Sequence, residues 1–152
     1  MGFEAGMKRR AITVKILIKA MWVLMLSAYY RWLMLYKPFA AIENGLGQKD
    51  CETSREPVDA AITDEVGWLV PAVCTRTPWQ SMCLVQALCA RRLLNREHLP
   101  CTIYFGVARG ENEQLSAHAW LRCGDRVVTG GEVAKRYTVT GVYGDMEKVR
   151  NS

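Results

Sequence analysis

The stretch Thr77-Pro78-Trp79-Gln80-Ser81-Met82-Cys83-Leu84 contains the clearest start signal for a helix in this chain. Thr77 is a favoured N-cap residue, a proline follows at the first helical position, and Gln80 stands three residues after the cap, as in a capping box. The helix is expected to run to about Asn95. Cys83 then lies within its first two turns.

One face of this predicted helix carries residues at i, i+4, i+7 and i+11 spacing, which are Cys83, Ala87, Ala90 and Leu94. Their small side chains allow the helix to lie close to a sheet. Cys89 projects about 240° away from Cys83, so these two thiols do not share a site. His98, followed by Leu99-Pro100, is expected to end the helix in the left-handed conformation, which histidine adopts more readily than most residues.

A period typical of strands begins at residue 101. Strands are expected at 101–108, 116–123, 126–129 and 137–142, with Gly124-Asp125 as a two-residue hairpin turn. The second strand contains Ser116-Ala117-His118-Ala119-Trp120-Leu121, which places His118 on the sheet. The sequence therefore predicts an α+β fold in which the cysteine-bearing helix packs on a small antiparallel sheet.

The N-terminal third is apolar and predicted to be helical. A helix is expected from residue 10 to about 36, ended by Pro38, followed by a loop over 39–50 and a shorter helix over 56–72 that stops near Pro71. We expect an apolar helical region at 1–50 and a second region at 51–152 that carries Cys83 and His118, together forming one compact unit.

The apolar N-terminal stretch follows Lys8-Arg9-Arg10, as a signal peptide or membrane anchor would. Its longest uncharged run, Ala20 to Tyr30, is 11 residues, whereas a spanning helix needs about 20. The sequence Tyr29-Tyr30-Arg31-Trp32 is unlike a cleavage site. We therefore expect apolar helices that pack on the domain or on a partner protein, with a peripheral membrane contact as the open alternative.

Composition narrows the classes of function. The chain has 152 residues, half of them hydrophobic, which suits one domain with a substantial core. Its net charge of +5 is scattered and forms no basic stripe with interleaved aromatics, so nucleic-acid binding is not predicted, although an acidic peptide would suit it. None of the six cysteines forms a CxxC pair and the two histidines complete no ligand set, so we expect no metal, no cofactor and mostly buried, reduced thiols.

Cys83 and His118 together suggest a nucleophile and its base. A helix N-terminus and a nearby imidazolium both stabilise a thiolate. An imidazole on a packed strand can take the thiol proton and later give it to a leaving amine. The order, a helix cysteine followed 35 positions later by a strand histidine, favours a catalytic pair over two separate core residues.

The hairpin restricts what can orient the histidine. If Gly124-Asp125 is the turn, Cys123 pairs with Arg126 and His118 with Gly131. Asp125 is then about 15–20 Å from His118, too far to orient it.

Glu132 follows the position predicted to pair with the histidine, and a bulge at Gly130-Gly131 would turn its side chain inward. A solvated Glu132, and a Cys–His dyad helped by a backbone carbonyl, stay open as alternatives. For the oxyanion, the candidate donors are the Cys83 amide and the Gln80 side chain. The Gln80 side chain is equally a candidate for the capping-box hydrogen bond.

Four segments resemble the lasso-peptide leader peptidases, the protease halves of lasso biosynthesis B proteins within the transglutaminase-like superfamily. These segments are residues 79–88 around Cys83, residues 93–100, Phe105-Gly106-Val107, and Ala117-His118-Ala119-Trp120-Leu121. The resemblance covers about residues 60–140, and the apolar helix before Lys37-Pro38-Phe39 is similar to the family's N-terminal region.

This resemblance implies a cytoplasmic bacterial cysteine endopeptidase that removes the leader from a ribosomally made precursor, after which a separate cyclase closes the core using ATP. The chain leaves no room for the leader-binding domain of fused members, so it resembles the split form served by a separate leader-recognition protein. The apolar N-terminal helices would dock that protein or the cyclase.

The chain departs from the family where members often carry aspartate a dozen residues after the histidine, because this position is Gly130. A second departure is His98, where the family commonly has glycine. A transglutaminase-like acyltransferase and a non-catalytic adaptor of the same fold are the alternatives.

Overall fold

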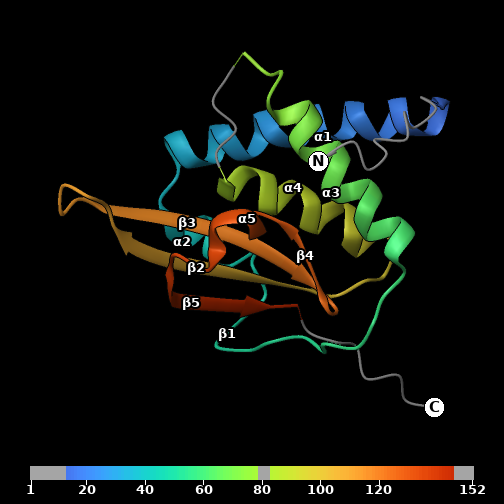
Figure 1. The fold of residues 1–152 in the computed structure, drawn as a ribbon. Coiled ribbons are helices and arrows are strands. Elements are labelled where there is room, and N and C mark those ends of the chain that lie inside the picture. Colours follow the sequence, from blue (N-terminus) through green and yellow to red (C-terminus); the bar gives the residue numbers. More distant parts are fainter. Residues whose placement is uncertain (1–12, 79–82, 146–152) are drawn as a thin grey trace, which may run out of the picture.

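The computed structural model describes residues 13–78 and 83–145, and Figure 1 shows its arrangement. The helices are α1 (Val14–Tyr36), α2 (Phe39–Glu43), α3 (Ala60–Cys74), α4 (Cys83–Arg96) and α5 (Gly131–Ala134). The strands are β1 (Gln48–Lys49), β2 (Cys101–Arg109), β3 (Leu115–Cys123), β4 (Arg126–Thr129) and β5 (Thr138–Gly144). The predicted α+β class is confirmed.

The strands form one antiparallel sheet in the order β1-β5-β2-β3-β4. The central hairpin β2–β3 is paired along its whole length, from Cys101 opposite Cys123 to Arg109 opposite Leu115. Cys123 also pairs with Arg126 on β4, which confirms the predicted turn at Gly124-Asp125.

The expected pairing of His118 with Gly131 is wrong. β4 ends at Thr129, opposite Leu121, and the chain then turns into α5. The irregularity in this pairing falls between Leu121 and Arg122, not at Gly130-Gly131. The edge of β3 beside His118 is consequently not paired with β4.

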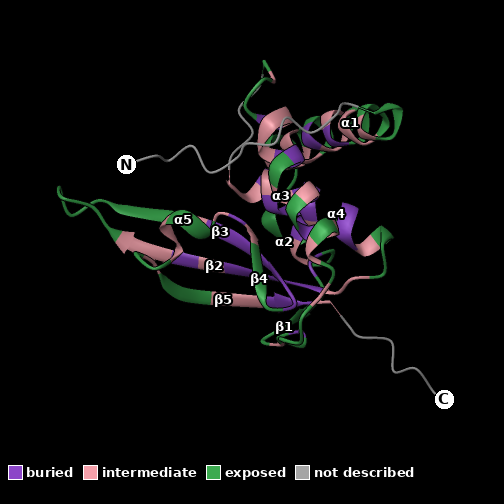
Figure 2. Cartoon of the chain, turned by 45° about the vertical axis from the view of Figure 1, so that its right-hand side comes forward, coloured by how far each residue is buried: buried purple, intermediate pink, exposed green. Residues whose placement is uncertain are grey.

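The helices are distributed unevenly over the sheet. α4 packs on one face, with α1 and α3 against its outer side, and α5 lies on the opposite face (Figures 1 and 2). The α4 side of the sheet contributes to the core through Cys101 and Ile103 of β2 and Leu121 and Cys123 of β3. Because side chains alternate along a strand, the residues between these project toward the α5 side.

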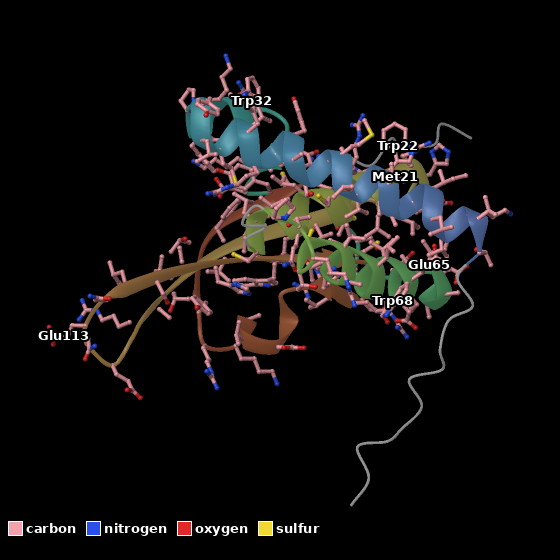
Figure 3. All side chains as sticks on the ribbon, turned by 90° about the horizontal axis from the view of Figure 1, so that it is seen from above. Met21, Trp22, Trp32, Glu65, Trp68 and Glu113 are labelled. Atoms are coloured by element: carbon pink, nitrogen blue, oxygen red, sulfur yellow. The ribbon has the colours of Figure 1, made fainter. Side chains whose placement is uncertain are left out.

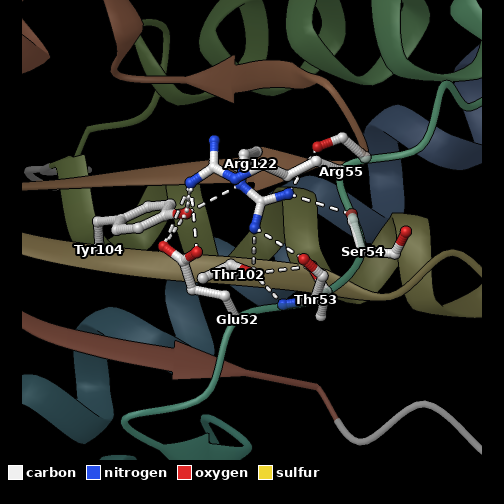
Figure 4. A network of polar contacts seen from close by, with 8 residues as sticks. Glu52, Thr53, Ser54, Arg55, Thr102, Tyr104 and Arg122 are labelled. Carbon is white, nitrogen blue, oxygen red and sulfur yellow. Dashed lines mark hydrogen bonds and ion pairs between the residues drawn. The ribbon is translucent and has the colours of Figure 1, made fainter.

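A buried polar network covers the α5 side of β2 and β3 (Figure 4). The Arg122 guanidinium is buried and donates to the Tyr104 hydroxyl at 2.8 Å. It also donates to Thr102 Oγ1 and to the carbonyls of Thr53, Ser54 and Gly124. One side chain therefore fastens residues 53–54 to the sheet, and Tyr104 extends the network by donating to Glu52 Oε1 at 2.8 Å.

The long N-terminal helix ends before Pro38 as predicted, and its Thr13 N-cap accepts a bond from the Ile16 amide. α3, however, continues through Pro71 to Cys74, so the predicted stop is wrong. Leu69, Val70 and Cys74 are buried on this helix, and their packing outweighs the one amide hydrogen bond that proline removes.

The segment 39–50, expected to be a loop, contains the short α2 and β1. Beyond α4, which ends at Arg96, His98 has φ 60°, which confirms its predicted left-handed conformation.

Candidate active site

A groove of about 450 Å³ opens between the C-terminal end of α1, α2, the start of α4 and the sheet. Its wall includes Met34, Phe39, Cys83, Phe105, His118 and Thr140. The predicted cysteine and the predicted histidine therefore border the same space. Most of the remaining wall is apolar, which suits a peptide whose side chains are uncharged.

Cys83 is the first described residue of α4 and is half-buried. A side chain in this part of a helix lies near the positive end of the helix dipole. Residues 79–82 are outside the described part of the chain, so the predicted capping box and the oxyanion role of Gln80 remain predictions. The Thr77 hydroxyl donates to the Cys74 carbonyl at 2.9 Å.

His118 lies on β3 opposite Gly106 of β2. Its Nε2 is 2.9 Å from the carbonyl oxygen of Gly130. A carbonyl can only accept, so Nε2 carries the proton, and the neutral ring has its lone pair on Nδ1. This tautomer is the one in which Nδ1 acts as a base while Nε2 is held.

Two aromatic rings contact the imidazole. The Trp120 ring stacks with it at a centroid distance of 5.8 Å, and the Tyr137 ring lies at 5.0 Å. The Trp120 ring in turn stacks on Tyr104, which belongs to the Arg122 network. The orientation of His118 is thus coupled to the most strongly bonded part of the sheet.

Two glycines make room for this arrangement. Gly130 has φ 73°, and a Cβ there would lie 2.9 Å from His118 Nε2 and 2.8 Å from the Ala119 carbonyl oxygen. At Gly106 a Cβ would lie 2.9 Å from the Trp120 ring. A side chain at either position would displace the imidazole or the ring stacked on it.

The thiol and the imidazole are not joined in this structure. By strand alternation the His118 ring projects with Trp120 toward α5, while the groove and α4 lie on the other face of β3. Within residues 13–78 and 83–145, no hydrogen bond links Cys83 Sγ to the ring. A catalytic pair therefore requires local rearrangement at the start of α4 or at the β3 edge that β4 does not cover.

Neither Glu132, the predicted orienting group, nor Asp125, which was predicted to be too far away, has a hydrogen bond to the imidazole among the described residues. Glu132 is exposed on α5, and His118 Nε2 donates to the Gly130 carbonyl instead. Asp125 is exposed in the turn, as its exclusion from the site required. A backbone carbonyl thus holds the ring, as in the carbonyl-assisted alternative, while the Cys83–His118 dyad itself and a catalytic role for Glu132 remain predictions.

The other thiols are poor candidates for the nucleophile. Four cysteines are buried and form no disulfide, namely Cys74, Cys89, Cys101 and Cys123. A hydrogen bond with Cys74, and then burial, raise the pKa of Cys89. The pKa of Cys101 is raised in the same way by its bond with Cys123 and by burial. The raised pKa keeps Cys89 and Cys101 protonated at neutral pH, whereas the hydrogen bond with Cys101 lowers the pKa of Cys123. No group of three or more metal-ligating side chains occurs among the described residues.

Sequence reasoning did not identify three contributors to the site. Met34 and Phe39 come from the N-terminal region yet line the groove. Tyr137 precedes β5 and contacts the imidazole only because α5 returns the chain to β3. The aromatic and apolar character of these residues gave no indication of such placement, since it is equally typical of core residues.

The comparisons with known proteins give one match. A family model described as the transglutaminase-like superfamily matches residues 24–142, from the middle of α1 into β5. No curated protein and no solved structure matches the chain.

Proposed function

Because the chain belongs to the transglutaminase-like superfamily, which includes cysteine proteases and acyltransferases, we propose that it is a cysteine peptidase that removes the leader from a lasso-peptide precursor. The observation that carries this proposal is that Cys83, at the start of α4, lines the same apolar groove as the segment of β3 that carries His118. The ring of His118 is held through Nε2. A separate leader-recognition protein delivers the precursor, and a cyclase uses the released core. The reaction takes place in the cytoplasm.

The proposed chemistry proceeds in two steps. His118 Nδ1 takes the proton from Cys83 Sγ, and the thiolate attacks the scissile carbonyl carbon. The peptide C–N bond breaks, the imidazolium gives its proton to the departing amine, and the leader remains as a thioester on Cys83. Water, deprotonated by the same ring, then hydrolyses the thioester and frees the leader carboxylate and the thiol.

Two backbone groups and one side chain supply the remaining catalytic roles in this proposal. The Gly130 carbonyl holds the imidazole through Nε2, and the Cys83 amide with the Gln80 side chain binds the oxyanion. Glu132 is the alternative orienting group. Glu132→Gln distinguishes the two, since the substitution leaves cleavage unchanged if the carbonyl alone orients the ring.

In this proposal the Cys83 thiol and the His118 imidazole come together only when the substrate is bound. A precursor strand lying in the groove contacts the start of α4 and the backbone of β2 and β3 together, so its binding energy can support the rearrangement. We therefore expect cleavage to require the precursor together with its recognition protein.

The test is reconstitution of the full chain with a precursor and its recognition protein, followed by mass spectrometry of the peptide products. Cys83→Ala and His118→Ala should each abolish cleavage. Cys51→Ala and His98→Asn are matched controls, since Cys51 is the other half-buried thiol and asparagine tolerates the left-handed conformation of His98. Full cleavage by Cys83→Ala would end the proposal.

The same experiment separates the two alternative functions. Hydrolysis adds one water to the summed product masses, whereas an acyltransferase joins the leader to an added amine. A non-catalytic adaptor is favoured by one observation, the position of the His118 ring on the face away from α4. It predicts precursor binding with no product from the wild-type chain.

A further inference from the structure

One long face of α1 is apolar and uncovered. Its exposed large side chains are Val14, Leu17, Ile18, Met21, Trp22, Met25, Tyr29, Trp32, Leu35 and Tyr36. Figure 2 shows exposure recurring along this helix, and in Figure 3 no described element lies over it between the labelled Met21 and Trp32. An apolar face of this extent on a soluble monomer indicates an interaction surface.

The opposite face of α1 is fixed to the protein. Val23 and Ser27 are fully buried, and Lys19 Nζ forms an ion pair with Glu65 of α3 at 2.5 Å. By length and composition alone α1 could cross a membrane, but signal sequences and core helices of soluble proteins have the same length and composition. Crossing would break these contacts, whereas lying along a surface would keep them.

The charged residues of α1 are all basic. Residues 5–42 contain no aspartate or glutamate, and α1 itself carries only Lys15, Lys19 and Arg31. The Arg96 guanidinium lies 4.9 Å from the Trp22 ring, and the Lys37 ammonium lies 5.9 Å from the Trp32 ring. Cations therefore flank the apolar face near both ends.

Nearby acids do not cancel this positive charge. Glu65 is already paired with Lys19. Glu97 lies at the end of the face, where it borders a small pocket with Lys15 and Arg96. Basic groups and indole rings beside an apolar face are typical of helices that lie in the interface of an anionic bilayer.

We propose that the exposed face of α1 binds the surface of an anionic lipid bilayer, with the helix axis in the membrane plane. The apolar residues enter the headgroup boundary, and the flanking cations contact lipid phosphates. A second copy of the chain is a poorer occupant, because it would bring two sets of like charges together. This proposal is independent of peptidase activity, so Cys83→Ala should bind vesicles as the wild type does.

The experiment is flotation of the full chain with vesicles of neutral phosphatidylcholine, and with vesicles that also contain phosphatidylglycerol. We expect binding to the anionic vesicles, weakened by salt. Neutralising Lys15 or Lys37 with glutamine should weaken partitioning about fivefold each. Met21→Glu combined with Trp32→Glu should abolish it, while Leu115→Glu, at an exposed apolar residue of the β2–β3 hairpin, should not.

Circular dichroism and thermal melting of each variant show that loss of binding is not loss of folding. The proposal would be overturned if the chain bound neither the neutral nor the anionic vesicles. It would also be overturned if the chain bound both kinds of vesicle equally. If the chain bound the recognition protein in the absence of vesicles, and Met21→Glu combined with Trp32→Glu abolished that binding, the face would be assigned to a protein instead. A solution dimer disrupted by the same variants would assign it to a second copy.

Discussion

Replacing Gly130 with alanine tests how the imidazole is held. The backbone at this position is left-handed, with φ 73°. An added Cβ would lie 2.8 Å from the Ala119 carbonyl oxygen, 2.9 Å from His118 Nε2 and 3.0 Å from Trp120 Cβ. Two of these contacts involve backbone or Cβ atoms that cannot turn aside, so the Gly130 segment itself must move.

The cost follows from these contacts. A non-glycine residue in the left-handed region costs about 1–2 kcal/mol. Displacing the Gly130 carbonyl removes the Nε2 hydrogen bond, which contributes about 0.5–1.5 kcal/mol. The two together predict a loss of about 1.5–3.5 kcal/mol in the free energy of unfolding. A typical domain remains folded after such a loss.

Urea unfolding at neutral pH measures this loss. Gly110→Ala is the matched control, because the nearest atom to a Cβ there is the Gln114 carbonyl oxygen at 3.6 Å, an ordinary contact. Nitrogen NMR of the labelled imidazole reports the tautomer, which should be Nε2–H in the wild type and a mixture in Gly130→Ala. Equal stability of the two variants, with an unchanged tautomer, would refute this account of the site.

Three further predictions concern stability. Arg122→Met should lower the free energy of unfolding by about 3–5 kcal/mol, because it leaves several buried acceptors without a donor. Arg122→Lys should lie between the wild type and Arg122→Met, because an ammonium has three donors for the five hydrogen bonds. Chemical denaturation measures both variants. The hydrogen bond from Tyr104 holds the pKa of Glu52 below its usual value. This carboxylate therefore stabilises the fold at neutral pH and ceases to do so as the pH falls through the lowered pKa. On acidification, Glu52→Gln should lose less melting temperature than the wild type does. Leu94→Ala, at a fully buried core position, should cost about 2–5 kcal/mol, whereas Leu115→Ala should stay within about 0.5 kcal/mol in the same assay.

The strands and the main helices were readable from the sequence because local signals and tertiary packing agree there. Alternation and the Gly124-Asp125 turn predicted the β2–β3–β4 meander, and the observed register at Cys123 follows from that turn. The left-handed His98 was predicted from a backbone preference alone. At these positions few alternative conformations compete.

Local signals failed where packing decides. Pro71 is a helix breaker by itself, yet it lies inside α3 because the buried residues around it hold the helix in place. The segment 39–50 has turn-forming residues, but β1 forms by pairing with β5, almost a hundred residues away. A single sequence contains no record of such pairing.

The site was only partly predictable, for the same reason. Spacing identified Cys83 and His118, and both border the groove. The acceptor for His118 is a backbone carbonyl at Gly130, and no side-chain pattern can reveal it. Strand alternation could be read from the sequence, but the sequence does not say which face of the sheet α4 covers. That the His118 ring lies on the face away from α4 therefore became visible only in the structure.

The most direct test of the central claim is covalent capture of the nucleophile. The full chain, with its recognition protein, is incubated with a leader peptide whose C-terminal carbonyl is replaced by a vinyl sulfone, and peptide mapping locates the adduct. We predict one adduct, on Cys83, that is lost in His118→Ala and retained in Cys51→Ala. An adduct on another cysteine, or equal labelling of Cys83 with and without the imidazole, would contradict a catalytic Cys83–His118 pair.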